Sequence, residues 1–314
     1  MKPKTGWGDG RLMDAEREAV AGETAGEPRM LADYGCSCGE NPLWHPDERR
    51  IYWTDIPNGR LYRYDPVTGA HAACYDGEPV GGFTLQEDGS LLLFGVRGSV
   101  RVWREGALGA TVLEEIADEA ASRFNDVIAD PAGRVFCGTM SPDDHSREGR
   151  LYRLDPDGSI RIVVEGVGCP NGMGFTPDGR GMYFTDSSRR EIYHFDYDRA
   201  AGEISNRRVF ARVPEGEGVP DGLTVDAAGC VWSARWDGSA VVCYAPTGEV
   251  LRRVPFPVRK VSSVAFGGDG YDTLYCTTAG GDRKDADGAS AGALFSLSVA
   301  GSRGVPEFRS RIGL

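Results

Sequence analysis

The chain has 314 residues, 40% of them hydrophobic and 26% charged, which is enough apolar material for a substantial folded core. Its formal net charge is −12 with no cluster of lysine and arginine, which argues against binding to nucleic acids or to anionic membranes. No apolar run approaches the roughly 20 residues that a membrane-spanning helix needs.

The N-terminal segment is polar, charged and without hydrophobic periodicity. We therefore predict a flexible tail over residues 1–26 and one folded domain over residues 27–314. The tail lacks the apolar core of a signal peptide. The eight cysteines form no C-x-x-C pair and mostly lie in apolar segments, which favours reduced thiols and a cytoplasmic protein. Cys36 and Cys38 lie close together in "CSCGEN", and a metal or redox role stays open for them.

One pattern repeats from residue 40 onward: a polar or small residue, an apolar strand, a turn, and a second apolar strand. Six segments share it, and they are "ENPLWHPDERRIYWTD" from Glu40, "GGFTLQEDGSLLLFG" from Gly81, "NDVIADPAGRVFCGT" from Asn125, "NGMGFTPDGRGMYFTD" from Asn171, "DGLTVDAAGCVWSAR" from Asp221 and "SSVAFGGDGYDTLYCTT" from Ser262. Glycine stands eight positions after the first residue in five of the six segments, and Glu48 takes that place in the first. A third strand-like piece and a less regular fourth piece follow most segments.

The six units recur about every 40 to 50 residues with about four strands each, a period typical of β-propeller blades. We predict an all-β, six-bladed β-propeller with very little helix. An array of β-sandwiches is the alternative, but the constant register of the repeat disfavours it.

The innermost strand of each propeller blade lines the central channel, so the six first residues of the repeat should form a ring. Four of them carry side-chain oxygens, while Gly81 would leave open space and Ser262 is small. Two carboxylates and two amides that converge on one axis are costly unless they are paired. A divalent cation would relieve that cost, and oxygen ligands suit Ca²⁺, Mg²⁺ or Mn²⁺. A hydrogen-bonded polar plug is the alternative.

Asn171 stands in a Pro-Asn-Gly triplet, which is typical turn chemistry. We predict that this turn aims the Asn171 amide into the ring.

Four motifs resemble the SMP-30/regucalcin/gluconolactonase family, and they are "GENPLWHPDERRIYWTDI", "RFNDVIADPAGRVFCGTM", "PNGMGFTPDGRGMYFTDS" and "PDGLTVDAAGCVW". The resemblance covers almost everything after about residue 30. It implies a six-bladed propeller that uses a divalent metal to hydrolyse sugar (aldono-)lactones to the acid. The residues that it implies are the metal ligands Glu40, Asn171 and Asp221, Asn125 beside the metal and the substrate, and the substrate contacts Arg123 and Asp143.

The implied mechanism has the metal polarise the lactone carbonyl, with Asp221 or a metal-bound water as base or nucleophile. Calcium is the first choice of metal, with Zn²⁺, Mg²⁺, Mn²⁺ and Fe²⁺ as alternatives. The expected partner is a small-molecule sugar lactone, with no nucleic acid or membrane, for a monomer or small homo-oligomer. The chain departs from the family where it reads "NDVI" instead of N-D-G-K, which removes a lysine near the substrate, and where Cys38 replaces a leucine.

Two other functions stay open at this point. A phosphotriesterase like diisopropylfluorophosphatase would use the same metal, because a cation polarises P=O as well as C=O. A non-catalytic calcium-binding propeller would hold a metal without an open coordination position.

Overall fold

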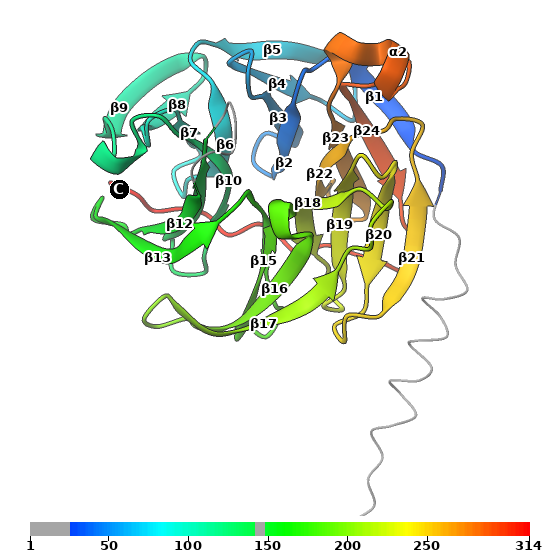
Figure 1. Cartoon of the computed structure of the whole chain (residues 1–314). Helices are drawn as coiled ribbons and strands as arrows, with labels where there is room; N and C mark the ends of the chain where they lie inside the picture. The colour runs from blue at the N-terminus through cyan, green and yellow to red at the C-terminus, as the bar shows by residue number, and fades with distance from the viewer. Residues whose placement is uncertain (1–25, 142–147) are drawn as a thin grey trace, which may run out of the picture.

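Six four-stranded antiparallel sheets stand around a central axis in the computed structural model of the chain (Figure 1). The structure describes residues 26–141 and 148–314. Each sheet is one blade, and the first strand of each of the six repeats lies innermost, in contact with the first strands of its neighbours. The predicted six-bladed all-β propeller is confirmed.

The strands follow the predicted units in chain order. Blades one to three comprise β2 (Gly39–His45), β3 (Arg50–Asp55), β4 (Arg60–Tyr64) and β5 (His71–Asp76); β6 (Val80–Leu85), β7 (Leu91–Gly95), β8 (Val100–Arg104) and β9 (Ala107–Leu113); and β10 (Arg123–Ala129), β11 (Val135–Met140), β12 (Gly149–Leu154) and β13 (Ile160–Val167). Blades four to six comprise β14 (Pro170–Phe175), β15 (Gly181–Asp186), β16 (Glu191–Asp198) and β17 (Glu203–Arg212); β18 (Val219–Val225), β19 (Val231–Trp236), β20 (Ala240–Tyr244) and β21 (Val250–Pro255); and β22 (Val261–Gly267), β23 (Thr273–Thr278), β24 (Ala293–Ser298) and β1 (Arg29–Asp33).

Helix is scarce in the described ranges, as predicted. It comprises the 3₁₀ turns η1 (Ala117–Glu119), η2 (Ser187–Arg189) and η3 (Gly281–Arg283) and the four-residue helix α2 (Lys284–Asp287). None of these helical pieces has the length and apolar character needed to cross a bilayer.

The sixth blade takes its outer strand from the other end of the chain. β1 pairs with β24, so this sheet has the order β1-β24-β23-β22. The Gly26 N–H extends the contact by donating to the Ser298 carbonyl at 2.9 Å. Hydrogen bonds between the two ends of the chain therefore close the ring. Apart from Gly26, the predicted tail over residues 1–26 lies outside the described residues.

The recurrent glycine of the repeat is explained by the turn between the first two strands of a blade. Gly133 and Gly179 have φ angles of 86° and 65°, in the left-handed region that a side chain disfavours. In blade three the Gly133 N–H closes the turn on the Asp130 carbonyl at 3.0 Å, and Asp130 Oδ1 accepts the Ala132 N–H at 2.8 Å. In blade three, aspartate and glycine at these offsets thus set where the inner strand ends.

The core lies between neighbouring blades, where each sheet packs its apolar face on the next. Phe94 of blade two and Phe124 of blade three are fully buried and pack edge to face, with ring centroids 5.3 Å apart. The inner strands β6, β14 and β22 are buried along their whole length. Burial of apolar area between blades is therefore what holds the inner strands in place.

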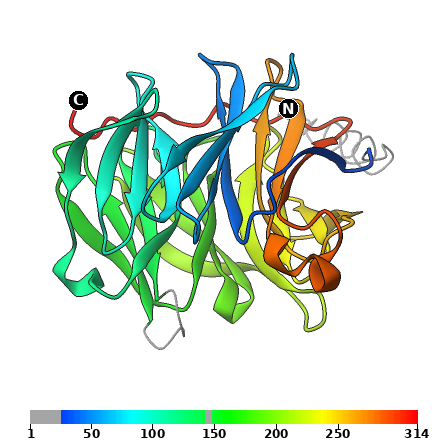
Figure 2. The ribbon, with the colours of Figure 1, turned by 90° about the horizontal axis from the view of Figure 1, so that it is seen from above.

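The C-terminal segment, residues 303–313, which we call the strap, runs along one end of the ring (Figure 2). Its backbone bonds to residues at the ends of inner strands or just beyond them: the Ala227 N–H donates to Arg303 O at 2.8 Å, and the Ser310 N–H donates to Leu85 O at 2.9 Å. The Arg311 N–H donates to Gly133 O at 2.9 Å. The strap therefore ties blades two, three and five together at the end where the inner strands finish.

We expect Phe94→Ala to lower the free energy of unfolding by about 3–5 kcal/mol, because it leaves a cavity between two blades. Denaturant unfolding measures this loss. Val67→Ala is the matched control, since Val67 is 75% exposed and the change should stay within about 0.5 kcal/mol. Equal effects of the two substitutions would show that the interface between blades does not carry the stability.

Candidate metal centre

A cavity of about 330 Å³ opens at the end of the channel where the inner strands begin. Four inner strands of the repeat contribute to its polar lining, with Glu40 on β2, Asn125 on β10, Asn171 on β14 and Asp221 on β18. All four are less than a tenth exposed, and Arg123 at the start of β10 lines the same space. The structure thus brings together five of the six residues that the sequence analysis assigned to a site; the sixth, Asp143, lies outside the described residues.

The other two ring positions do not open space into this cavity, so the expectation for Gly81 is wrong. A Cβ on Gly81 would lie 1.9 Å from the Phe124 carbonyl oxygen, because the neighbouring strand β10 fills that position with backbone. Ser262 is fully buried, and its hydroxyl donates to the Gly39 carbonyl. Both residues serve close packing between inner strands.

A register shift interrupts each inner strand at the polar residue. In β2 it lies between Glu40 and Leu43, and in β14 it lies between Asn171 and Met173. β10 and β18 have the same irregularity between Phe124 and Val127 and between Pro220 and Leu223. Such bulges redirect side chains locally. The predicted turn at Pro170-Asn171-Gly172 is therefore wrong, because these residues begin a strand and the irregularity redirects the amide.

Gly172 is required by the neighbouring blade. A Cβ there would lie 2.4 Å from the Leu223 backbone nitrogen and 2.6 Å from the Asp221 carbonyl oxygen. This close approach brings β14 and β18 together directly beside two of the polar residues. Gly172, which the sequence placed in a turn, instead allows β14 and β18 to pack closely.

Hydrogen bonds order the two amides. Asn125 Nδ2 donates to the Pro170 carbonyl at 2.8 Å and to Asn171 Oδ1 at 3.2 Å. Arg123 Nη1 donates to Asn125 Oδ1 at 2.6 Å. Asn171 Nδ2 donates to the Ser187 hydroxyl at 3.0 Å. The Asn125 amide is engaged at both ends, and the Asn171 oxygen is turned toward Asn125.

The two carboxyl groups have a neighbouring cation, Arg123, but its charge does not offset the effect of burial on their pKa values. Burial raises the pKa of Glu40 to about 8, and nearby Asp126 adds to this shift. Burial also raises the pKa of Asp221 well above its ordinary range, with the Glu40 charge as the next cause. Asp221 Oδ1 is buried and has no hydrogen-bond partner among the described residues.

The side chains around this cavity have the chemistry to bind a divalent cation. An orphaned carboxylate oxygen, a second buried carboxyl group and an amide oxygen form a donor set that hard cations prefer. The set mixes acids with amides, and no group of three or more His, Cys, Asp or Glu side chains suited to a metal occurs in residues 26–141 and 148–314. A cation here would thus depend on the amides as well as on the acids.

Cys38, Met140, Cys169, Val219 and Trp236 supply most of the rest of the cavity wall. Of these, Cys38 had a metal or redox role left open by the sequence, and Met140, Cys169 and Val219 were not predicted. The sequence gives little indication that these residues line a site, because they lie outside the first position of the repeat or resemble ordinary strand residues. All eight cysteines are free, and burial raises the pKa of the Cys169 thiol to about 12, so this wall offers thiols and not thiolates.

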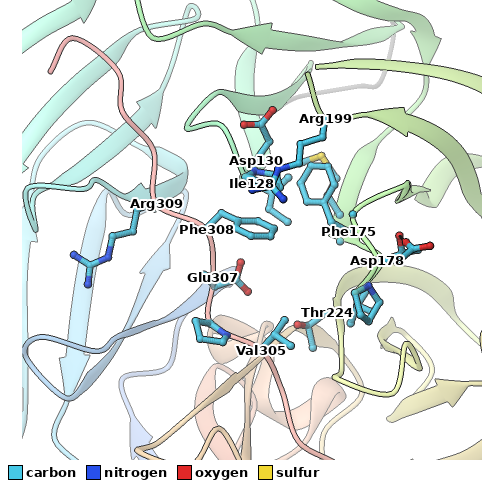
Figure 3. Close-up of a pocket in the computed structure, with 18 of the residues that line it drawn as sticks. Ile128, Asp130, Phe175, Asp178, Arg199, Thr224, Val305, Glu307, Phe308 and Arg309 are labelled. Atoms are coloured by element: carbon cyan, nitrogen blue, oxygen red, sulfur yellow. Dashed lines mark hydrogen bonds between the residues drawn. The ribbon is translucent and has the colours of Figure 1, made fainter. Parts of the chain in front are cut away.

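A larger cavity, of about 600 Å³, lies at the opposite end under the strap (Figure 3). Phe308 of the strap packs against Phe175 with ring centroids 6.0 Å apart, and Glu307 lies beside them. Asp130 in its wall is already paired with Arg134 and Tyr197. None of the predicted ligands lines this cavity, so size alone does not mark the site.

A family model described as the SMP-30/Gluconolactonase/LRE-like region matches residues 38–280. The chain belongs to this family. The matched residues include all five described site residues, while the strap lies beyond them.

Three relatives illustrate the range of the family. The pentonolactonase XacC of Haloferax volcanii is 51% identical over 291 residues, covering 90% of this chain and 98% of that protein. The 6-deoxy-6-sulfogluconolactonase of Pseudomonas putida is 35% identical over 266 residues, covering 83% of this chain and 91% of that protein. The structure of a calcium-binding protein, regucalcin, from Agrobacterium tumefaciens matches with a TM-score of 0.82 at 25% identity, covering 90% and 97% of the two chains.

We expect the metal-free protein to lose stability as the pH rises from the ordinary carboxyl value of 4.5 toward about 8. In this range folded Glu40 and Asp221 keep protons that the unfolded chain has released, so the free energy of unfolding falls with rising pH. Thermal unfolding in the presence of a chelator measures the slope.

The double variant Glu40→Gln, Asp221→Asn isolates the contribution of these two groups, because Asp126 and Glu307, whose pKa values are raised to about 6 and about 7, still titrate in it. A shallower slope than that of the unaltered protein is expected. Identical slopes would contradict the assignment of the shifts to this pair.

Proposed function

We propose that this protein is a divalent-metal-dependent lactonase that hydrolyses a sugar lactone to the corresponding sugar acid. The observation that carries the proposal is the group of buried oxygens in the 330 Å³ cavity, where Asp221 Oδ1 has no partner among the described residues. Two relatives support a lactone as the substrate, one named as a pentonolactonase at 51% identity and one named as a 6-deoxy-6-sulfogluconolactonase. Arg123, which lines the cavity, offers donors for the hydroxyls of a sugar.

Glu40, Asn171 and Asp221 are the residues that would hold the cation, with Asn125 beside it. When bound, a divalent cation polarises the lactone carbonyl and stabilises the negative charge that develops on its oxygen. Calcium is our first choice because all of the side-chain donors are hard oxygens, and the structural relative from Agrobacterium tumefaciens is named as a calcium-binding protein.

Asp221 is the proposed general base. It accepts a proton from the attacking water at a carboxylate oxygen while the water oxygen bonds to the carbonyl carbon. The ring C–O bond then breaks, and the proton returns from Asp221 to the ring oxygen, which becomes the hydroxyl of the open-chain acid. The carboxylate is restored at the end of the cycle, so no further reactant is needed.

Arg123 and Asn125 form the proposed substrate-binding pair. Arg123 Nη1 is held by the Phe124 carbonyl at 2.8 Å and by Asn125 Oδ1 at 2.6 Å. A guanidinium carries five N–H donors, and Nη2 and Nε have no partner among the described residues, so they can bind the hydroxyls of a sugar. Asp143 stays a proposed further contact on the family pattern alone.

The proposed substrate class is a five-carbon aldonolactone. The identity to the pentonolactonase is 51%, against 35% to the 6-deoxy-6-sulfogluconolactonase. The wall formed by Met140, Val219 and Trp236 is apolar, which suits the C–H face of a sugar ring better than a charged substituent.

Removing the metal tests the proposal directly. We expect chelation to abolish lactone hydrolysis and added calcium to restore it. Asp221→Asn should lower kcat/KM for a pentonolactone by about 10²-fold or more while the protein stays folded, because a neutral amide replaces the base and a negatively charged ligand. A pH-indicator assay of acid release measures both.

The control is Asp237→Asn. Asp237 is exposed, directly follows the cavity residue Trp236 in sequence, and forms an ion pair with Arg259. This variant should retain full activity. Hydrolysis that survives chelation, or an organophosphate triester hydrolysed faster than any lactone, would overturn the proposal.

Arg123→Ala should lower kcat/KM by roughly 10- to 100-fold, since hydrogen bonds from a charged group contribute about 1.5–3 kcal/mol. The loss should appear mainly in KM, with calcium still bound, because the guanidinium contacts the substrate and not the cation. Steady-state kinetics with parallel calcium titration separate the two quantities. An unaltered lactone KM would remove Arg123 from the substrate site.

A further inference from the structure

Ser187 is the last residue of the motif "PNGMGFTPDGRGMYFTDS", and the sequence analysis assigned it no role. It is the first residue of η2, directly after β15, and it is only 7% exposed. Its N–H donates to the Cys169 carbonyl at 3.0 Å, which fixes the backbone against the strand that carries Asn171. Ser187 also lines the same cavity as the proposed ligands.

The Ser187 hydroxyl has one proton, and its neighbours decide where that proton goes. It donates to the Pro220 carbonyl at 2.6 Å, because a carbonyl can only accept. The hydroxyl oxygen is then left to accept, and Asn171 Nδ2 donates to it at 3.0 Å. This pair of bonds distinguishes the two ends of the Asn171 amide, whose nitrogen and oxygen have nearly the same shape.

The same hydroxyl also joins two blades. Asn171 and Ser187 belong to blade four, whereas Pro220 immediately precedes Asp221 in blade five. One side chain therefore orients one proposed ligand and anchors the backbone next to another. Thr185 and Asn171 pair in register across β14 and β15, but the Thr185 hydroxyl is buried without a partner among the described residues and gives no such orientation.

We propose that Ser187 is a positioning residue that keeps the Asn171 oxygen facing the cation site and the backbone before Asp221 in register with it. Without the Ser187 acceptor, the Asn171 amide keeps only the Asn125 Nδ2 donor at 3.2 Å and a long Cys169 Sγ contact at 3.8 Å to oppose a half-turn. The turned amide would present its NH₂ group to the cation, which repels it. The inference rests on the proposed function, because it concerns the same metal centre. Partners of metal ligands of this kind typically affect metal affinity by about 10- to 100-fold.

Calorimetric titration with calcium alone is the test. Ser187→Ala should weaken calcium binding by about tenfold or more, whereas Ser187→Thr, which keeps the hydroxyl, should bind nearly as tightly as the unaltered protein. The matched control is Ser188→Ala: Ser188 is the next residue, lines the same cavity and is exposed, and its replacement should leave calcium affinity unchanged. At saturating calcium the lactone KM of Ser187→Ala should equal that of the unaltered protein.

A double-mutant cycle separates orientation from general damage. In the Asn171→Asp variant the side chain has two equivalent oxygens and no N–H, so it needs no acceptor to orient it. Ser187→Ala should therefore weaken calcium binding when Asn171 is present and have little effect when it is combined with Asn171→Asp. Equal losses in both backgrounds would overturn the positioning role.

The outcomes also distinguish this inference from the proposed function. If the unaltered protein binds no calcium and hydrolyses no lactone, the proposed function fails and Ser187 has no cation to position. If the unaltered protein binds calcium but Ser187→Ala and Ser188→Ala bind it equally well, only the role of Ser187 is overturned. Should Ser187→Ala unfold, Ser187→Cys, which keeps the volume but is a weak hydrogen-bonding group, provides the same comparison.

Discussion

Glu40 and Asp221 place two carboxyl groups in one buried space, and the cost of burying them as carboxylates is the constraint on which the rest of the site depends. Burial raises the pKa of both groups, the Glu40 charge raises that of Asp221 further, and Asp221 keeps one oxygen without a partner among the described residues. Like charges in a space with little water are costly unless a cation or a proton balances them. The protein holds this arrangement because the two residues lie on different blades and cannot separate without breaking the ring.

The packing between blades supplies the stability that offsets this cost. Apolar side chains such as Phe94 and Phe124 bury their surfaces between blades, and β1 closes the ring by pairing with β24. Close backbone approaches at Gly81 and Gly172 leave the inner strands little freedom to shift. The polar site is thus built at the junction of rigid elements, which is how binding groups keep their geometry when their own interactions are unfavourable. The strap adds hydrogen bonds at the opposite end of the same strands.

Much of this architecture could be predicted from the sequence because the repeat has a constant register. Glu40, Asn125, Asn171 and Asp221 hold the same position in four repeats, and the structure gathers them around one cavity. The repeat could not show which ring positions face open space. The backbone of β10 occupies the space beside Gly81, and the sequence around Gly81 does not indicate this contact with a neighbouring blade.

Other features escaped prediction for related reasons. β1 is short and mostly exposed, so it lacks the apolar signal of a strand, and its partner is almost the whole chain away. Ser187 follows a second strand, outside the first position of the repeat, and its importance lies in contacts with two residues distant in sequence. Contacts such as the one from Ser187 to Pro220 in blade five become visible only when the blades are assembled.

The central claim is that Glu40, Asn171 and Asp221 hold one divalent cation at the end of the channel away from the strap. The most direct measurement is an anomalous-scattering map from crystals of the unaltered protein grown with Mn²⁺, which substitutes for calcium in oxygen sites. This account predicts an anomalous peak in contact with the side-chain oxygens of all three residues. A map with no peak there, or with its peak instead beside Asp126 and Glu307 in the channel, would contradict it.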